Sequence, residues 1–271
     1  MWHNKGVKKY WTIFTTSWST GFVYRLNFLL WRIRSVILVL SVYFFWDTVF
    51  SGNQTFFGYT KEKILTYVFL TLILRSFILG VRSIDVGGEI SDGRLANYLL
   101  RPVNYLWYWF TRDWADKLLN LIFAAGEFIL LFWLLKPEIY FQSSLLIVGS
   151  FFVAVVLGII VNFLLGSITS YATFWTPGNT WGLWFVFIVV QELLAGVLFP
   201  LDVLPKYLYD LVMLTPFPYL LYFPANLYLG KIPGTDVFQG LIVSLFWVVC
   251  LYILTIKIWQ KGLRTYQAEG K

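Results

Sequence analysis

The sequence has very few of the residues from which enzymes build nucleophile and metal sites. Among its 271 residues there is one histidine, His3, and one cysteine, Cys250. The chain therefore cannot form an internal disulfide or assemble a set of Cys and His ligands for a metal. His3 stands at the extreme N-terminus and Cys250 lies within an apolar run, which argues against a Ser–His or Cys–His nucleophile pair. We expect neither catalytic residues nor a metal site.

Two motifs of hydrolytic enzymes are missing as well. The sequence has no His-Glu-x-x-His motif, and its Gly-Lys pairs at 230–231 and 270–271 lack the upstream glycine of a phosphate-binding loop. We expect that this chain does not hydrolyse nucleotides by that route.

Charged residues are scarce as well. Charged residues make up 13% of the chain, about half the share in a soluble domain. Hydrophobic residues make up 59%, and the mean hydropathy is +0.70. So few charges cannot cover a water-facing surface, and the excess apolar surface has to face lipid. The sequence is that of an integral membrane protein with room for about six helical spans of about 20 apolar residues each.

Long apolar stretches predict where these spans lie. The stretch 139–191 carries no charge at all. As one helix it would measure about 80 Å at 1.5 Å per residue, far more than a hydrocarbon core of about 30 Å. The turn residues Thr176-Pro177-Gly178-Asn179 divide it in two. We predict an all-α membrane protein with six spans at about 34–50, 64–84, 114–135, 144–171, 181–199 and 237–259.

The distribution of basic residues predicts the orientation. Six spans put both termini and the second connection on one side of the membrane, and basic residues gather on the cytoplasmic side. Fifteen of the 21 basic residues fall on the side of the termini, and five on the other. We expect a multi-pass protein of the cell membrane with cytoplasmic termini, and its net charge of +7 needs no nucleic-acid partner. The fifteen are Lys5, Lys8, Lys9, Arg25, Arg32, Arg34, Arg82, Arg94, Arg101, Arg112, Lys117, Lys257, Lys261, Arg264 and Lys271.

Outside the spans the chain has three distinctive segments within a single transmembrane domain, 1–271. The first, 1–27, is cytoplasmic or interfacial: three lysines precede an aromatic and hydroxyl-rich stretch at 10–22, which predicts a helix in the headgroup plane. A disordered basic tail is the alternative. The second is the cytoplasmic loop 82–113, and the third is the external segment 200–236.

The loop 82–113 is the most polar part of the chain, and its middle predicts a short helix at about 91–100. Ser91 or Asp92 caps its start, Leu95 and Leu99 repeat at four-residue spacing, and Pro102 ends it. An amphipathic helix of about two turns is unstable alone in water. It needs a partner surface, such as a groove of a soluble subunit. An interfacial helix that only turns the chain around is the alternative.

The external segment 200–236 holds six of the nine prolines. These prolines and Asp210 exclude a continuous seventh span, because a proline inside lipid leaves backbone groups without hydrogen bonds. We expect short broken helices that re-enter against the outer leaflet; an aromatic belt at the interface is the alternative. The six are Pro200, Pro205, Pro216, Pro218, Pro224 and Pro233.

Three charges fall well inside predicted spans: Arg75, Glu127 and Glu192. An unpaired charge there costs several kcal/mol, so we expect Arg75 to pair with one of the two glutamates. A proton relay through the three groups is the alternative. The fourth span also carries small and polar residues at four-residue spacing, which favours close helix packing over a substrate path. They are Ala154, Gly158, Asn162, Gly166 and Ser170.

Two motifs in these positions resemble a known family. The first, Gly-Glu-Ile-x-x-Gly-x-Leu-x-x-Tyr-Leu-Leu-Arg-Pro at 88–102, lies between the second and third predicted spans. It resembles the coupling-helix region of permeases of the type-2 ABC transporter class, in the family of small six-span permeases without a fused ATPase domain. The second runs from Gly196 through Phe199-Pro200 to Pro205, with Pro216 and Pro218 downstream. It is similar to the Phe-Pro-x-x-x-x-Pro pattern that follows the fifth span in that class.

The resemblance implies a permease that dimerises with itself or with a sister permease and binds two ATPase subunits on its cytoplasmic side. It implies substrate transport across the lipid bilayer, most often outward. ATP and magnesium would sit on the partner ATPase, and this chain would bind no cofactor. The implied coupling residues are Glu89, Ile90, Asp92, Arg94, Leu95, Tyr98, Leu99, Arg101 and Pro102. The implied gate or pathway residues are Glu192, Gly196, Phe199, Pro200 and Pro205.

Two other classes stay open on the sequence. One is a stand-alone channel or secondary transporter that uses Arg75, Glu127 and Glu192. The other is a membrane assembly factor that transports nothing.

Overall fold

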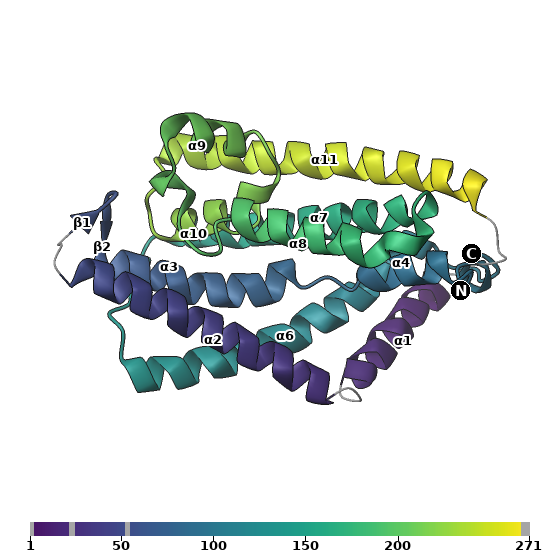
Figure 1. The fold of residues 1–271 in the computed structure, drawn as a ribbon, viewed down its shortest axis with the longest axis horizontal. Coiled ribbons are helices and arrows are strands. Elements are labelled where there is room, and N and C mark those ends of the chain that lie inside the picture. The colour runs from purple at the N-terminus through teal and green to yellow at the C-terminus, as the bar shows by residue number, and fades with distance from the viewer. Residues whose placement is uncertain (1–2, 22–24, 52–54, 267–271) are drawn as a thin grey trace.

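The computed structural model describes residues 3–21, 25–51 and 55–266 (Figure 1). Within these ranges the chain is nearly all helix, as predicted, apart from a hairpin of two short strands, β1 (Thr55–Phe56) and β2 (Tyr59–Thr60). The long helices are α1 (His3–Gly21), α2 (Arg25–Phe50), α3 (Lys61–Leu74), α6 (Tyr105–Leu135), α7 (Leu145–Tyr171), α8 (Thr180–Leu194) and α11 (Gly234–Thr265). The short helices are η1 (Arg75–Leu79), α4 (Ile84–Ser91), α5 (Ala96–Leu99), η2 (Ala172–Phe174), η3 (Pro177–Asn179), η4 (Leu201–Val203), α9 (Lys206–Met213), η5 (Phe217–Tyr219) and α10 (Tyr222–Tyr228).

Five helical segments of the described chain are long and apolar enough to cross a membrane. They include five of the six predicted spans. The remaining one, at 181–199, corresponds to α8, which has 15 residues and measures about 22 Å at 1.5 Å per residue. It ends early because the chain turns at Gly196, whose φ of 79° lies in the left-handed region that suits glycine. The five segments are Arg32–Phe50, Lys61–Ser91, Tyr105–Leu135, Leu145–Phe174 and Gly234–Thr265.

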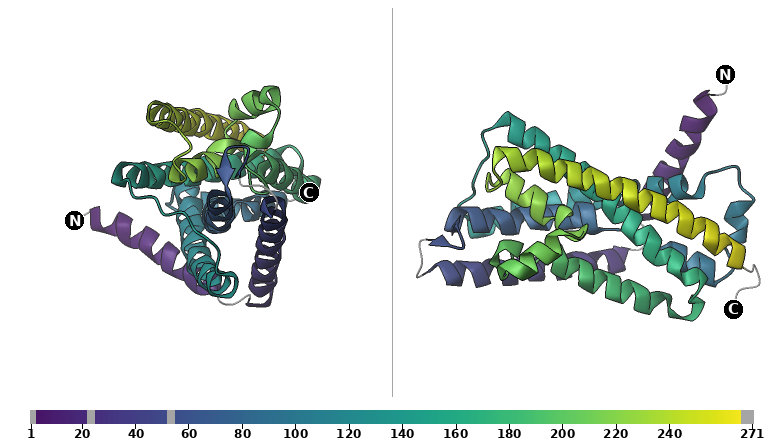
Figure 2. Two further views of the ribbon diagram at one scale, coloured as in Figure 1. Left: turned by 90° about the vertical axis from the view of Figure 1, so that its left-hand side faces the viewer. Right: turned by 90° about the horizontal axis from the view of Figure 1, so that it is seen from above.

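The bundle is organised around α7. This helix packs against α11, α10 and α4 (Figures 1 and 2). The second half of α7 is largely buried, with Ile159 and Val161 at 0% exposure, and the first half exposes apolar side chains such as Phe152 at 62%. A helix that is apolar on its exposed face as well as its buried face is suited to lipid on its outside.

The two ends of the bundle differ. The start of α1 and the end of α11 lie at the same end of the bundle as α4, and we name this the α4 end; β1, β2 and α9 lie at the opposite end, the hairpin end (Figures 1 and 2). Both ends of the described chain therefore lie at the same end of the bundle. The predicted headgroup-plane helix at 10–22 corresponds to α1, which packs against α6; residues 22–24 lie outside the described ranges.

The segment 200–236 consists of broken helices, as its prolines predict. The short helices η4, α9, η5 and α10 follow one another, and α10 lies against α7 and α3. Leu220, Leu221 and Ala225 of this segment are 0% exposed. The segment therefore returns from the hairpin end into the core of the bundle.

The second candidate span, Lys61–Ser91, covers the predicted 64–84 but is not one continuous helix. Instead of continuing to residue 84, α3 passes at Arg75 into the π-helical turn η1 and ends at Leu79, and residues 80–83 form an irregular break before α4. The third span is longer than predicted, because α6 begins at Tyr105 with Asn104 as its cap. The polar loop is accordingly confined to the residues around α4 and α5.

Candidate coupling and pathway sites

The predicted helix at 91–100 is wrong in its boundaries. Ser91 and Asp92 stand at the end of α4, and only the four residues of α5 are helical after it. Gly93 adopts a left-handed φ of 73°, which lets the chain reverse. The backbone N–H of Leu95 then donates to the carbonyl of Glu89 over 3.0 Å, and the Leu95 side chain is 0% exposed. Leu95 is part of the core rather than of a docking surface.

The base of this loop is held by buried polar contacts. The hydroxyl of Tyr105 donates to Glu89 Oε2 over 2.7 Å, and both residues are buried together with Ile90. From the end of α11, the Tyr266 hydroxyl donates to the Gly93 carbonyl over 2.7 Å. Burial, with contributions from Tyr108 and Glu89, raises the pKa of the half-buried Tyr98 above its usual value, so its hydroxyl stays protonated. The loop is therefore fastened to both α6 and α11.

The tip of the loop, in contrast, is open. Leu99 is 47% exposed and Leu100 is 87% exposed. Asp92 and Arg94 pair with each other over 2.7 Å on the exposed side. Of the nine implied coupling residues, Glu89, Ile90 and Leu95 are buried, Tyr98 is half-buried, and the others are exposed: Asp92, Arg94, Leu99, Arg101 and Pro102.

Helix α1 touches this tip as well. The ammonium of Lys9 donates to the carbonyl of Pro102 over 2.6 Å. The amphipathic N-terminal helix and the loop therefore meet at the α4 end of the bundle.

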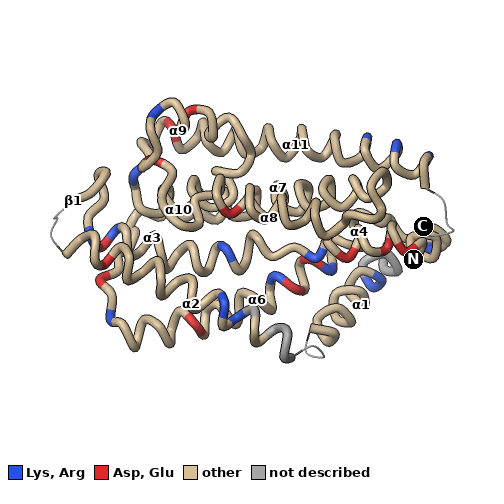
Figure 3. Tube along the Cα trace, in the orientation of Figure 1, with Lys and Arg blue, Asp and Glu red and all other residues tan. Residues whose placement is uncertain are grey.

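The charges inside the bundle form two pairs. Arg75 donates to Glu192, and Arg34 lies 3.8 Å from the same carboxylate. Glu127 pairs with Arg32, not with Arg75, and Arg32 also donates to Ser76 Oγ over 3.3 Å. Figure 3 shows how few charged positions lie midway along the bundle. Arg75 lies about 21 Å along α3 from Lys61 at 1.5 Å per residue.

Arg32 and Arg34, which the sequence counts with the side of the termini, lie at the start of the apolar segment of α2, Arg32–Phe50. Both lie within α2, on the same side as the Glu127 and Glu192 carboxylates that they approach. Opposite charges in the bundle relieve the cost of burying each charge alone.

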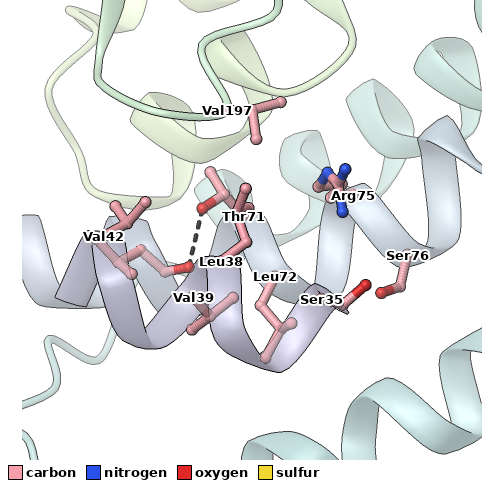
Figure 4. A pocket seen from close by; sticks show the side chains of 10 residues that line it. Ser35, Leu38, Val39, Val42, Thr71, Leu72, Arg75, Ser76 and Val197 are labelled. Carbon is pink, nitrogen blue, oxygen red and sulfur yellow. Dashed lines mark hydrogen bonds between the residues drawn. The ribbon is translucent and has the colours of Figure 1, made fainter. Parts of the chain in front are cut away.

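A small cavity adjoins Arg75. Its volume is about 10 Å³, and its wall includes Val39, Thr71, Ser76 and Val197 (Figure 4). A space of this size holds about one water molecule. In this conformation the cavity between α2 and α3 is too small to admit a transported molecule.

A second cluster of polar side chains lies at the hairpin end. The Tyr59 hydroxyl donates to Asn226 Oδ1 over 2.6 Å, and Lys231 pairs with Asp202 over 2.6 Å. Burial lowers the pKa of Lys231, while Asp202 opposes this shift. Burial, reinforced by Asp202, raises the pKa of Tyr59 far above its usual value.

Of the implied gate residues, Glu192 pairs with Arg75, and the others follow the end of α8. The Tyr67 hydroxyl donates to the carbonyl of Gly196, and a Cβ at Gly196 would stand 2.8 Å from that hydroxyl. Gly196 and Pro200 are buried, Phe199 is half-buried and Pro205 is exposed. The structure thus brings Gly196 and Pro200 into the core and leaves Pro205 at the surface.

Sequence reasoning missed one buried ion pair, Asp113–Lys117. Its members are 1% and 0% exposed, and their charged atoms are 3.4 Å apart. The signal was an acid followed four residues later by a base, the spacing at which side chains meet on a helix. Among the described residues, no three His, Cys, Asp or Glu side chains gather closely enough to hold a metal ion.

The comparisons with known proteins identify the family. Residues 36–270 match the family model described as ABC-2 family transporter protein. A search of curated protein sequences gave no match. The family match covers most of the chain, and the five long apolar helices agree with a multi-pass membrane protein. The chain belongs to the ABC-2 transporter family, as a transmembrane permease of an ABC transporter.

Proposed function

We propose that this permease works with a separate ATPase subunit and that the exposed tip around Leu99 and Leu100 is the contact between them. The proposal is based on the contrast in exposure between the base and the tip of one loop. Its base is buried through Glu89 and Tyr105, while Leu100 is 87% exposed among charged neighbours. An exposed leucine pair on a rigid base is suited to insert into a groove of a soluble protein.

We also propose that the chain crosses the membrane six times. The start of α1 and the end of α11 lie at one end of the bundle (Figure 1). Helix α8 runs from this end toward the hairpin end, and the broken helices of 200–236 complete its crossing. With the excess of basic residues beside the termini, the α4 end would face the cytoplasm, where the ATPase and its ATP and magnesium would lie.

The pathway would form between two permeases, as a homodimer or with a sister chain. The Arg34 side chain is 48% exposed and the Glu192 side chain is 23% exposed, on the face made by α2, α3 and α8. Partly exposed charges at this depth are costly against lipid. A second permease against this face would cover them and enclose a route for an exported molecule.

The stand-alone carrier is less well supported. Each of its proposed relay carboxylates, Glu127 and Glu192, is held by an arginine, and the adjacent cavity has a volume of only about 10 Å³.

Co-purification tests the proposal. A Leu99→Asp/Leu100→Asp variant should fold normally but lose the ATPase on a tagged permease, because both side chains are exposed. Leu214→Asp, which alters an equally exposed leucine (73%) elsewhere, is the control and should retain it. Retention of the ATPase by the double variant would reject the tip as the docking contact. Leu95→Asp is unsuitable, because it would bury a charge in the core.

A further inference from the structure

The break between η1 and α4 leaves backbone carbonyls without helical partners. Residues 80–83 are irregular, and Gly80 is extended with φ −60° and ψ 123°. In a membrane protein each such carbonyl needs a partner from the surrounding protein, because lipid supplies none. The side chains that donate hydrogen bonds to these carbonyls therefore show which helices hold the break in place.

Helices α6 and α7 supply these partners. Lys117 of α6 donates to the carbonyl of Ile78 over 2.8 Å and also to that of Gly80. Asn162 of α7 donates to the same Ile78 carbonyl over 2.6 Å. Eight residues after Asn162 on α7, Ser170 donates to the carbonyl of Ser83. We name Asp113, Lys117, Asn162 and Ser170 the carbonyl clamp.

The Lys117 ammonium lies closer to two backbone carbonyls than to the Asp113 carboxylate. It has three donor hydrogens, and two of its contacts are carbonyls of the break. Asp113 Oδ2 lies 3.4 Å away and accepts no hydrogen bond from the described residues. The other oxygen, Oδ1, accepts the backbone N–H of Arg82 over 3.2 Å. Asp113 thus balances the buried charge and holds the far side of the break.

Close packing fixes the break against α7 and fixes α4 against α8. A Cβ at Gly166 of α7 would stand 2.8 Å from the Val81 side chain. A Cβ at Gly87 of α4 would stand 2.5 Å from Thr180 Cγ2, at the start of α8. Gln191 of α8 donates to Asn162 Oδ1, which extends the network to the residue before Glu192.

We propose that Lys117 is a positioning residue for coupling: the carbonyl clamp fastens the break to α6 and α7, so that α4 moves together with these helices while α3 bends at η1. The proposal rests on the proposed function for the source of that motion. It assigns a role to a fully buried ion pair that neither the docking tip nor the charge pairs around Arg75 explain. A movement of the tip would then be transmitted through α4 to α6 and α7.

The clamp itself is testable in the permease alone, in lipid nanodiscs. The variant Asp113→Asn/Lys117→Met removes the ion pair and both carbonyl contacts of Lys117 without changing net charge, while the amide oxygen at position 113 can still accept the Arg82 N–H. We expect backbone hydrogen exchange at 80–86 to rise at least tenfold. The control Asp202→Asn/Lys231→Met neutralises the ion pair at the hairpin end and should leave 80–86 unchanged. Unchanged exchange in the clamp variant would overturn the proposal.

A milder variant covers the case in which the double variant does not fold. Ser170→Ala removes one hydrogen bond to the break and should raise exchange at 83–86 by a few-fold. Exchange equal to that of the parent protein would also count against the clamp.

The coupling role is tested with spin labels in the complex with its ATPase. In a Cys250→Ser background, labels at Asp85 and Trp133 report on α4 and α6, and labels at Asp85 and Glu62 report on α4 and α3. Asp85 is exposed and lies outside the proposed docking tip. On trapping with ADP and vanadate, the Asp85–Trp133 distance should stay constant and the Asp85–Glu62 distance should change. In the clamp variant the Asp85–Trp133 distance should change or broaden. A parent protein in which Asp85 moves freely against Trp133 would contradict the proposal.

The hydrogen-exchange and spin-label experiments distinguish a failure of this proposal from a failure of the proposed function. If no ATPase co-purifies, the proposed function fails and the coupling role fails with it, while hydrogen exchange still decides whether the clamp holds the break. If the ATPase binds but the labels move independently of the clamp, only the present proposal fails.

Discussion

The two ends of the bundle use the same kind of buried polar contact to different effect. At the hairpin end, Tyr59, Asp202, Asn226 and Lys231 come from separate segments and satisfy one another. At the α4 end, buried contacts hold only the base of the loop, and Leu100 stays in the open. The first arrangement is complete within the chain. The second supports a surface that is available to a partner.

The largest expected effect is at the carbonyl clamp. Lys117→Met leaves Asp113 buried without its charge partner, which costs about 3–5 kcal/mol when one member of a buried pair is removed. Unfolding of the purified permease in mixed detergent measures this loss. Adding Asp113→Asn should recover part of it, because the stranded charge is gone. A single variant as stable as the parent would show that the pair is not buried as described.

Close packing at α4 gives the next largest effect. A Cβ at Gly87 would stand 2.5 Å from Thr180 Cγ2 and 3.1 Å from Thr173 Oγ1. We expect Gly87→Ala to destabilise the protein by about 1–3 kcal/mol through overpacking. Gly178→Ala is the matched control, because nothing lies within 4 Å of its added Cβ. Equal stability of the two variants in the same unfolding assay would contradict the tight α4 contact.

At the hairpin end the expected effect is smaller. The Lys231 and Asp202 side chains are 17% and 25% exposed, so some water screens their pair. Lys231→Met should cost about 1–2 kcal/mol, in the lower part of the range for hydrogen bonds to charged groups. Differential scanning fluorimetry measures the shift. A loss larger than that of Lys117→Met would reverse the ranking of the two ends.

The smallest effect on stability is expected at the tip. Leu99→Asp/Leu100→Asp should change the free energy of unfolding by about 0.5 kcal/mol or less, as for exposed substitutions. The same unfolding assay checks this. A large loss would mean that the tip packs against the rest of the chain and is not free for a partner.

Much of the architecture was predictable because spans and turns leave local signals. Apolar length located α2, α3, α6, α7 and α11, and the prolines marked the broken segment. The break at 80–83 left only a weak signal, Gly80, which a helix tolerates at a modest cost. It is held by side chains of α6 and α7, distant in sequence, that donate hydrogen bonds to the carbonyls of Ile78 and Gly80.

The misplaced coupling helix has a local cause. The Leu95–Leu99 spacing fitted an amphipathic helix, but Leu95 faces the core and Leu99 faces outward. Gly93 was the available sign of a helix end, since glycine is favoured just past a C-terminus. Partners of charges were harder to predict: Arg32 and Glu127 lie 95 residues apart, and only the fold brings them together.

The central claim is that the open tip of the loop contacts the ATPase, and site-specific cross-linking tests it most directly. A photoreactive label is placed at Leu100→Cys, or at the control Leu214→Cys, in a Cys250→Ser permease purified with its ATPase. The account predicts a cross-link to the ATPase from position 100 and none from position 214. Cross-linking from 214 with none from 100 would contradict it.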